Sequence, residues 1–324
     1  MTRNRKTDPL TATALLLTAM LAMAPLVARA AEDAAAGDAA AETRPAAELT
    51  VDQIVHNTNA VSYYQGDTGR AKVKMAIHDA QGRTRNREFT ILRWDQRDPN
   101  APEDDAEADK PAAKGDGEAK AKKPAPEKPA DVHTGEQKFY VYFEAPSDVK
   151  RTVFLVWKHL DKDDDRWLYV PALDLVKRIS AADKRTSFVG SHFYYEDVSG
   201  RNVDLDKHER VEGETNDTYY VLKNTPKDPD TVEFAYYKMW IHRESFVVVQ
   251  TKYYDEEGKN YRTYRAKKVD TIDGYPTVTV SEMHDHRGGG HTVLTYDDVQ
   301  YNVGLTEEIF SQRYLRRPPR KYLK

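Results

Sequence analysis

Residues 139–157 read FYVYFEAPSDVKRTVFLVW, and this stretch decides the fold of the chain. Two runs rich in β-branched and aromatic residues, 139–143 and 153–157, flank a polar turn, which is the pattern of neighbouring β-strands. Neither run alternates between apolar and polar residues. A strand with one wet face alternates, so apolar residues on both faces predict a sheet that is covered on both sides.

The same β-pattern continues along most of the chain. Val73, Met75 and Ile77 alternate with polar residues, as expected for a half-buried strand. Glycine-containing turns that suit tight hairpins follow several of the runs. Further strands are expected over residues 89–94, 167–170, 246–254, 261–269, 277–283 and 291–303. About ten strands at short intervals predict a mainly β protein, built on one antiparallel sheet that is strongly curved or closed.

Helices are few in this interpretation. Thr50 and Gln53 form a capping-box pattern at the start of a short amphipathic helix. Helical turns are expected near 194–199, within 236–241 and after Thr306. These elements cannot cover a sheet of about ten strands. The second face must then be shielded by closure of a barrel on its own side chains, by a partner, or by an apolar ligand.

The first thirty residues have the features of a secretory signal peptide. Arg3, Arg5 and Lys6 precede the apolar stretch Leu10–Val27, and Ala28-Arg29-Ala30 is a cleavage pattern. The alternative is a retained membrane anchor. Cleavage is favoured, and the mature protein is expected to be exported and soluble.

Two later segments are not expected to fold. Residues 31–49 are mostly alanine and acidic residues, and residues 98–131 contain six prolines and sixteen charged side chains but no large apolar one. Such segments cannot bury enough apolar surface to offset the entropy of ordering. Residues 50–324 are therefore expected to form a single domain, interrupted by a disordered insertion at 98–131.

Composition excludes several classes of function. The 324 residues contain no cysteine, which rules out disulfides, thiolate metal sites, cysteine nucleophiles and a lipid-modified cysteine anchor. The 49 basic and 53 acidic residues give a net charge of −4, which argues against a general nucleic-acid binder.

Motifs for catalysis are missing as well. The chain has no H-E-x-x-H, G-x-S-x-G, P-loop or dinucleotide-binding motif, so neither enzyme activity nor a cofactor is expected. His284, His286 and His291 are a weak candidate for a metal site, because a hairpin could bring the three imidazoles together. The alternative is a polar hairpin tip with exposed histidines. The hairpin tip is the favoured interpretation.

Residues 165–201, DRWLYVPALDLVKRISAADKRTSFVGSHFYYEDVSGR, carry a more specific signal. They resemble the signature of the LolA-like outer-membrane lipoprotein-sorting protein family, in which W-L-Y-x-P-A-L precedes R-I and then F-x-G-S-x-F-x-Y-E-D. The matching residues are Trp167, Leu168, Tyr169, Pro171, Ala172, Leu173, Arg178, Ile179, Phe188, Gly190, Ser191, Phe193, Tyr195, Glu196 and Asp197. The family usually has a small residue or glycine at Arg151 and an aspartate at His192, and it lacks the long insertion.

This resemblance implies a fold and a function. The implied fold is an incomplete antiparallel barrel, or half-barrel, with a few short helices as a lid over an apolar cavity. The implied function is transport of lipid or acylated protein across the periplasm toward the outer membrane. Members of this branch resemble accessory partners of RND-type lipid exporters, so such a transporter and an outer-membrane acceptor are the implied partners. The competing hypothesis is an interaction module that docks on a membrane transporter without cargo.

The cavity wall is predicted from large aromatic side chains, which give wide contact area without demanding one ligand shape. The six chosen residues are Phe143, Trp157, Trp167, Tyr169, Phe193 and Phe246. Arg178 is predicted either to meet an anionic headgroup at the cavity mouth or to pair with a carboxylate and pin the lid. The basic C-terminal tail is expected either to be solvated or to contact an anionic surface.

Overall fold

The structure, a computed structural model, describes residues 48–96 and 135–324. The predicted signal peptide, the insertion at 98–131 and all but the last two residues of the 31–49 segment lie outside the described residues. The described part contains thirteen strands and three short α-helices. The expected mainly β fold is therefore confirmed.

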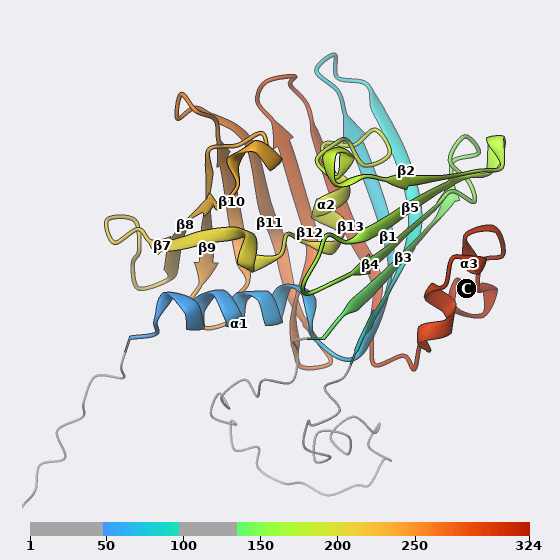
Figure 1. Cartoon of the computed structure of the whole chain (residues 1–324), viewed down its shortest axis with the longest axis horizontal. Helices are drawn as coiled ribbons and strands as arrows, with labels where there is room; N and C mark the ends of the chain where they lie inside the picture. Colours follow the sequence, from blue (N-terminus) through green and yellow to red (C-terminus); the bar gives the residue numbers. More distant parts are fainter. Residues whose placement is uncertain (1–47, 97–134) are drawn as a thin grey trace, which may run out of the picture. The chain divides into compact units, whose positions relative to one another are not determined.

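All thirteen strands belong to one antiparallel sheet (Figure 1). Their order is β6-β5-β4-β3-β2-β1-β13-β12-β11-β10-β9-β8-β7, with β1 and β13 paired in the middle and β6 and β7 at the two edges. The edges do not pair with each other, so the sheet is not closed into a barrel. The strands are β1 (Thr68–His78), β2 (Thr84–Asp95), β3 (Gln137–Ala145), β4 (Val153–Lys158), β5 (Asp165–Val170), β6 (Leu175–Ile179), β7 (Asp206–Arg210), β8 (Tyr219–Pro226), β9 (Tyr236–His242), β10 (Val248–Tyr254), β11 (Asn260–Ile272), β12 (Tyr275–Asp285) and β13 (His291–Tyr301).

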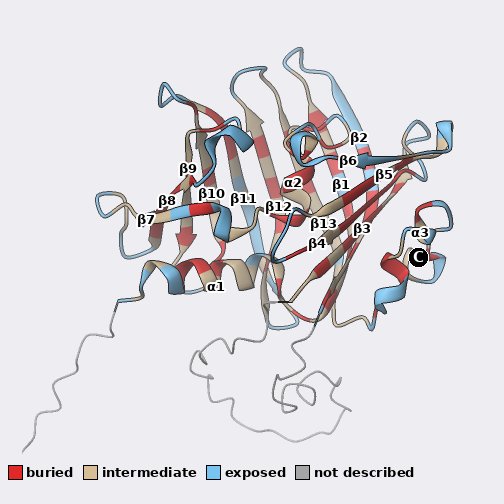
Figure 2. Ribbon diagram, viewed as in Figure 1, coloured by how far each residue is buried: buried red, intermediate tan, exposed pale blue. Residues whose placement is uncertain are grey.

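The chain crosses from one edge of the sheet to the other between β6 and β7. This connection, residues 180–205, contains the short helix α2 (Tyr195–Ser199) and two single-turn 3-10 helices. Its aromatic residues Phe188, Phe193 and Tyr195 pack on strands from the middle of the sheet. Figure 2 colours the ribbon by burial and shows buried segments on α2 and on the strands beside it. We call residues 180–205 the lid segment, and the sheet face beneath it the inner face.

Helix α1 (Val51–Tyr63) covers the other half of the inner face. It begins as the capping box predicts, because Thr50 and Gln53 exchange side-chain and backbone hydrogen bonds. Its buried residues Ile54 and Val55 pack against Tyr220, Leu222 and Ile241 of β8 and β9. The expected lid of short helices is thus formed by α1 and α2.

The C-terminal segment, residues 303–324, covers the outer face of strands β2 to β5. It contains α3 (Arg313–Arg316), and its Leu305, Ile309, Phe310 and Leu315 are buried against these strands. Strand β4 therefore has two dry faces: Phe154 and Val156 pack in the inner core, while Val153 and Leu155 pack under the C-terminal segment. Here the cover that the apolar runs require comes from the chain's own C-terminal residues.

One predicted element is wrong. The helical turn expected within 236–241 is strand β9, paired with β8 on one side and β10 on the other. Tyr237 and Ile241 are buried four residues apart, a spacing that fits one face of a helix and also one face of a strand. The cross-strand hydrogen bonds decide between the two.

The backbone at Arg151 explains why the family usually has a small residue or glycine at this position. It lies in the turn between β3 and β4 with a φ of 69°, in the left-handed region that favours glycine. A small residue or glycine at this position suits that backbone, and the present chain places arginine there instead. The neighbouring strand pairing is intact, with Tyr142 opposite Val153.

Candidate functional site: a cavity under the lid

The inner face, the lid segment and α1 line a partly open cavity of about 440 Å³. That volume lies within the range of small-molecule sites. The wall is mostly apolar and draws on strands from both halves of the sheet. Its apolar residues include Val55, Ala71, Met75, Phe89, Ile91, Val141, Phe188, Phe193, Val198, Met239, Val248, Tyr264, Met283, Leu294 and Tyr296.

One corner of the cavity is polar. The Thr277 hydroxyl and the Tyr301 hydroxyl are 2.8 Å apart, and the Gln65 amide Nε2 donates to the backbone carbonyl of Pro276 at 3.0 Å. The Oε1 atom of Gln65 is buried without a hydrogen-bond partner among the described residues. A buried acceptor is costly when it is left unpaired, so this corner favours a ligand with a donor group beside its apolar part.

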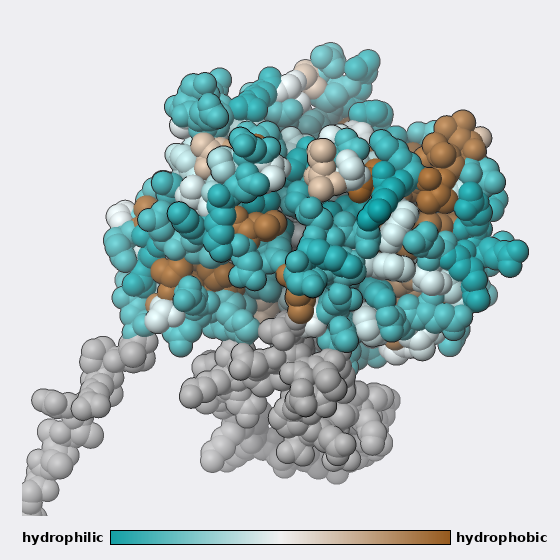
Figure 3. Space-filling view, viewed as in Figure 1, coloured by the Kyte–Doolittle hydropathy of each residue, from teal (hydrophilic) through white to brown (hydrophobic). Residues whose placement is uncertain are grey.

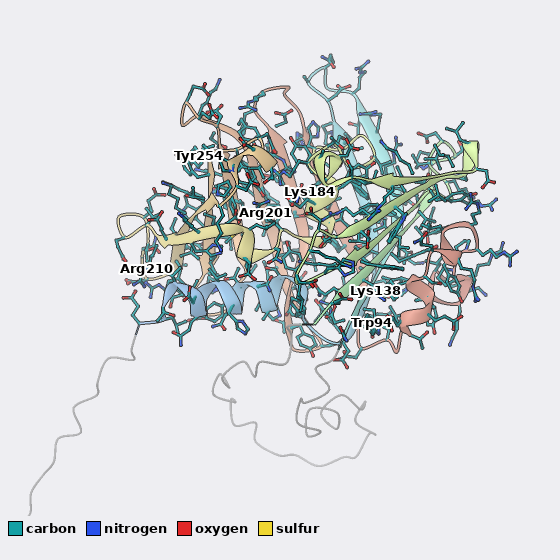
Figure 4. The ribbon with its side chains drawn as sticks, viewed as in Figure 1. Trp94, Lys138, Lys184, Arg201, Arg210 and Tyr254 are labelled. Carbon is teal, nitrogen blue, oxygen red and sulfur yellow. The ribbon has the colours of Figure 1, made fainter. Side chains whose placement is uncertain are left out.

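The lid segment is held on the sheet by buried ion pairs. Arg262 of β11 is buried, donates to the carbonyl of His192 at 3.0 Å and pairs with Asp197 of α2. From the lid, Arg185 donates to Glu233 at 2.6 Å and to Glu196 at 2.9 Å. Arg201, labelled in Figure 4, pairs with Asp206 at 3.0 Å. We call the five charged residues above, together with Arg201, the lid clamp.

The acidic turn after β4 takes part in holding the lid. Asp163 accepts a hydrogen bond from Lys184 of the lid segment at 3.2 Å, and Asp164 is largely buried. Lys158 of β4 donates to the carbonyl of Ser199 at 2.8 Å. Burial lowers the pKa of Lys158 to about 8, against the attraction of Asp164.

The end of α1 is anchored where the helix meets the lid. Gln137 and Arg93 donate to the carbonyl of Tyr63, the last residue of the helix, and Arg93 also reaches the carbonyl of Gly66 at 2.6 Å. The Tyr63 ring lies against Gly200, where an added Cβ would fall 2.2 Å from the ring. Gly200 also has a φ of 77°, so this contact between α1 and the lid requires glycine.

Asp95 lies beside this anchor, in surroundings that favour its protonated form. It is buried, its Oδ1 accepts from Gln137 at 2.8 Å, and Arg93 lies 3.3 Å from its Oδ2. Burial raises the pKa of Asp95 to about 7, although Arg93 and Gln137 oppose that shift. A raised pKa in the fold means that folding favours the protonated acid, and this contribution is lost as the pH rises toward and through 7.

We therefore expect the free energy of unfolding, relative to that of Asp95→Asn, to fall in the parent protein between pH 5 and pH 8. One pKa unit corresponds to about 1.4 kcal/mol, so the difference amounts to a few kcal/mol at most. Urea denaturation at both pH values measures it. The control is Asp270→Asn. Hydrogen bonds from Lys268 and Thr279 lower the pKa of the Asp270 carboxyl, so this group does not titrate between pH 5 and pH 8. Equal pH slopes for the parent and Asp95→Asn would contradict the prediction.

Of the six aromatic residues predicted for the cavity wall, Phe193 lines the cavity. Phe143 is buried beside it in the inner core, 5.1 Å from the Phe89 ring. Phe246 packs near α1, 6.5 Å from the Tyr220 ring. The other three, Trp157, Trp167 and Tyr169, lie on the outer face under the C-terminal segment and not in the cavity.

The remaining site candidates lie away from the cavity. Arg178 is on the edge strand β6, largely exposed, and pairs with Asp165 of β5. His284 and His291 are cross-strand neighbours, as the hairpin predicts, but their rings stack at 4.9 Å with nearly parallel planes. His286 hydrogen-bonds Thr263 at 2.9 Å. Within residues 48–96 and 135–324, no group of three histidine or carboxylate side chains is placed to hold a metal ion.

Neither most of the cavity wall nor the lid clamp was predicted from the sequence. Aliphatic residues such as Met75 and Leu294 carry no signal that separates a cavity wall from a packed core. The clamp arginine Arg262 stands in a strand that reads as polar, so nothing marks it as buried. The sequence signal for the clamp was the pair Glu196-Asp197. Two adjacent acids within an apolar motif need buried cations as partners.

Comparisons with known proteins support this fold. A family model described as "Uncharacterized protein" matches residues 135–317, more than half of the chain. The chain belongs to that family. No curated protein matches the sequence.

Three solved structures share the fold. They are a DUF1329 family protein from Desulfovibrio piger (23% identity, TM-score 0.62, 82% of this chain and 97% of that chain), a putative outer membrane lipoprotein-sorting protein domain from Vibrio parahaemolyticus (24%, 0.64, 82% and 97%), and a LolA superfamily protein from Nitrosomonas europaea (17%, 0.57, 82% and 100%). The fold is therefore LolA-like, as the resemblance of residues 165–201 implies.

No helix in the described part of the chain is long and apolar enough to cross a membrane.

Proposed function

We propose that this protein is a periplasmic carrier that binds the acyl chains of a lipid or lipoprotein in the cavity under the lid. The observation that carries the proposal is the cavity itself. It lies on the inner face, between the part of the sheet under the lid segment and the part under α1. The C-terminal segment shields the outer face of β2–β5, so it does not fill this space. In a filled barrel, side chains would occupy this space.

The chemistry of the wall suits an amphiphile. Acyl chains would contact apolar residues such as Met75, Val141 and Leu294, and a polar head would lie toward the corner formed by Gln65 and Thr277. The unpaired Gln65 oxygen supplies an acceptor for that head. We expect no catalytic step in this role. The proposed partners are an RND-type transporter in the inner membrane and an acceptor at the outer membrane.

The test is the lipid content of the protein. Protein purified without detergent is expected to release lipid into an organic extract and to bind a fluorescent fatty acid. Ala71→Trp should abolish most of this binding, because Ala71 lines the cavity and the indole would fill it. Ala76→Trp is the matched control, since Ala76 lies on the same strand and does not line the cavity.

Two outcomes would contradict the carrier. If the parent protein contains no lipid and binds no fatty acid, the cargo-free interaction module becomes the better description. If Ala71→Trp keeps its lipid while its thermal midpoint is unchanged, the lipid binds elsewhere. Should Ala71→Trp fail to fold, Ala71→Leu provides a smaller filling of the same space, and reduced fatty-acid binding is expected there as well.

A further inference from the structure

The turn between β5 and β6 exposes apolar side chains. Five large apolar side chains are exposed among the described residues, and only here do two stand together: Leu173, 71% exposed, and Leu175, 48% exposed. Pro171 and Ala172 complete the turn, and Figure 3 shows a hydrophobic patch at this end of the molecule. We call residues 171–175 the apolar tip. Exposed apolar residues that gather in this way mark an interaction site.

The apolar tip is held in place from below. Asp174 closes the turn with a φ of 44°, and its Oδ1 accepts from the Tyr169 hydroxyl at 3.2 Å and from Arg316 Nε at 2.9 Å. Arg316 also donates to the carbonyl of Asp174 at 3.2 Å. The two leucines are therefore displayed by a turn that is bonded to its own strand and to the C-terminal segment. Such preorganisation lowers the entropic cost of binding.

Exposed cations follow the tip in the sequence and lie on the segment that contacts it. Lys177 and Arg178 follow it on β6, Arg316 and Arg317 lie on the adjoining C-terminal segment, and all four are exposed. Arg151 is also exposed and acts electrostatically on Tyr169 beneath the tip. Asp174 in the tip pairs with Arg316, and Asp165, at the other end of β5, pairs with Arg178. Three cations, Arg151, Lys177 and Arg317, remain in excess of these pairs.

We propose that the apolar tip and the cations around it dock the protein reversibly on an anionic phospholipid bilayer. Leucine side chains on a protruding turn can enter the boundary between headgroups and acyl chains, while lysine and arginine meet the anionic headgroups. A protein partner would need a broad complementary surface, and a single turn with two leucines provides little of it. This docking does not depend on cargo in the cavity.

The test is sedimentation of the mature protein, without residues 1–30, with phosphatidylcholine vesicles prepared with and without phosphatidylglycerol. The parent protein is expected to bind the anionic vesicles and to be released by salt, because surface attraction between charges is screened. Leu173→Ser with Leu175→Ser should lower the bound fraction severalfold. Lys177→Gln with Arg317→Gln should weaken binding to the anionic vesicles and reduce its dependence on salt.

The matched control is Leu160→Ser. Leu160 is 50% exposed and lies at the opposite end of β5, in the turn after β4. It should leave binding unchanged. Failure of the parent to bind anionic vesicles, equal binding to neutral vesicles, or full binding by the double leucine variant would each overturn the proposal. None of these results bears on cargo, which the organic extract measures separately.

Discussion

Replacing Asp197 by alanine is expected to lower the free energy of unfolding by about 3–5 kcal/mol, because it leaves a buried guanidinium without its counter-charge. Arg262 is 2% exposed, and Asp197 is its carboxylate partner. The carbonyl of His192 and the Tyr194 ring, 3.9 Å from the guanidinium carbon, remain as contacts but carry no full negative charge. Urea denaturation of the parent and the variant measures the loss.

Two further variants show whether the loss comes from the buried charge. Arg262→Met combined with Asp197→Leu removes both charges and should recover much of the stability, since an apolar pair can replace a buried ion pair. Glu308→Ala breaks the pair with Arg313, in which both side chains are more than 60% exposed, and should cost less than about 1 kcal/mol. A similar loss for Asp197→Ala and Glu308→Ala would refute this account of the lid clamp.

Phe310→Ala is expected to cost about 3–5 kcal/mol, the usual price of truncating a buried aromatic side chain. Phe310 is fully buried between the C-terminal segment and strands β3 to β5, and its carbonyl accepts a hydrogen bond from Trp157 Nε1 at 2.7 Å. Loosening the segment exposes that indole to water. We therefore expect a red-shifted tryptophan emission together with a lower thermal midpoint.

Gln312→Ala is the control for this prediction, because Gln312 is an exposed residue of the same segment. It should change neither the midpoint nor the emission. If Phe310→Ala unfolds like the parent, the C-terminal segment does not stabilise the outer face. The two-sided apolar pattern of β4 would then require another cover.

The cavity under the lid is a space that the side chains of the described residues do not fill. Arg201 and Lys184 attach the lid segment to Asp206 and Asp163. Phe188 and Phe193 line the cavity from the lid, and so do the clamp residues Arg185, Glu196, Asp197 and Arg201. A ligand in the cavity still contacts mainly apolar surface.

Local sequence was sufficient for several parts of the structure. The capping box at Thr50 predicted the start of α1, and the Gly-rich turn at 287–290 predicted that His284 and His291 would face each other across a hairpin. The residues near 194–199 predicted the short helix α2. The fold itself was implied by the family resemblance of residues 165–201. The helix start and the hairpin depend on backbone hydrogen bonds and turn geometry between near neighbours, which residue type controls directly.

The tertiary structure alone decided which face of each strand looks inward. When both faces are apolar, alternation gives no direction, so Trp157 and Trp167 could not be assigned to the outer face from the sequence. Only the path of residues 303–324 shows what covers them. The buried position of Arg262 likewise depends on the lid segment crossing the sheet, a contact between residues 65 apart in the chain. Long-range packing determines such positions, and a polar residue in a strand gives no local sign of it.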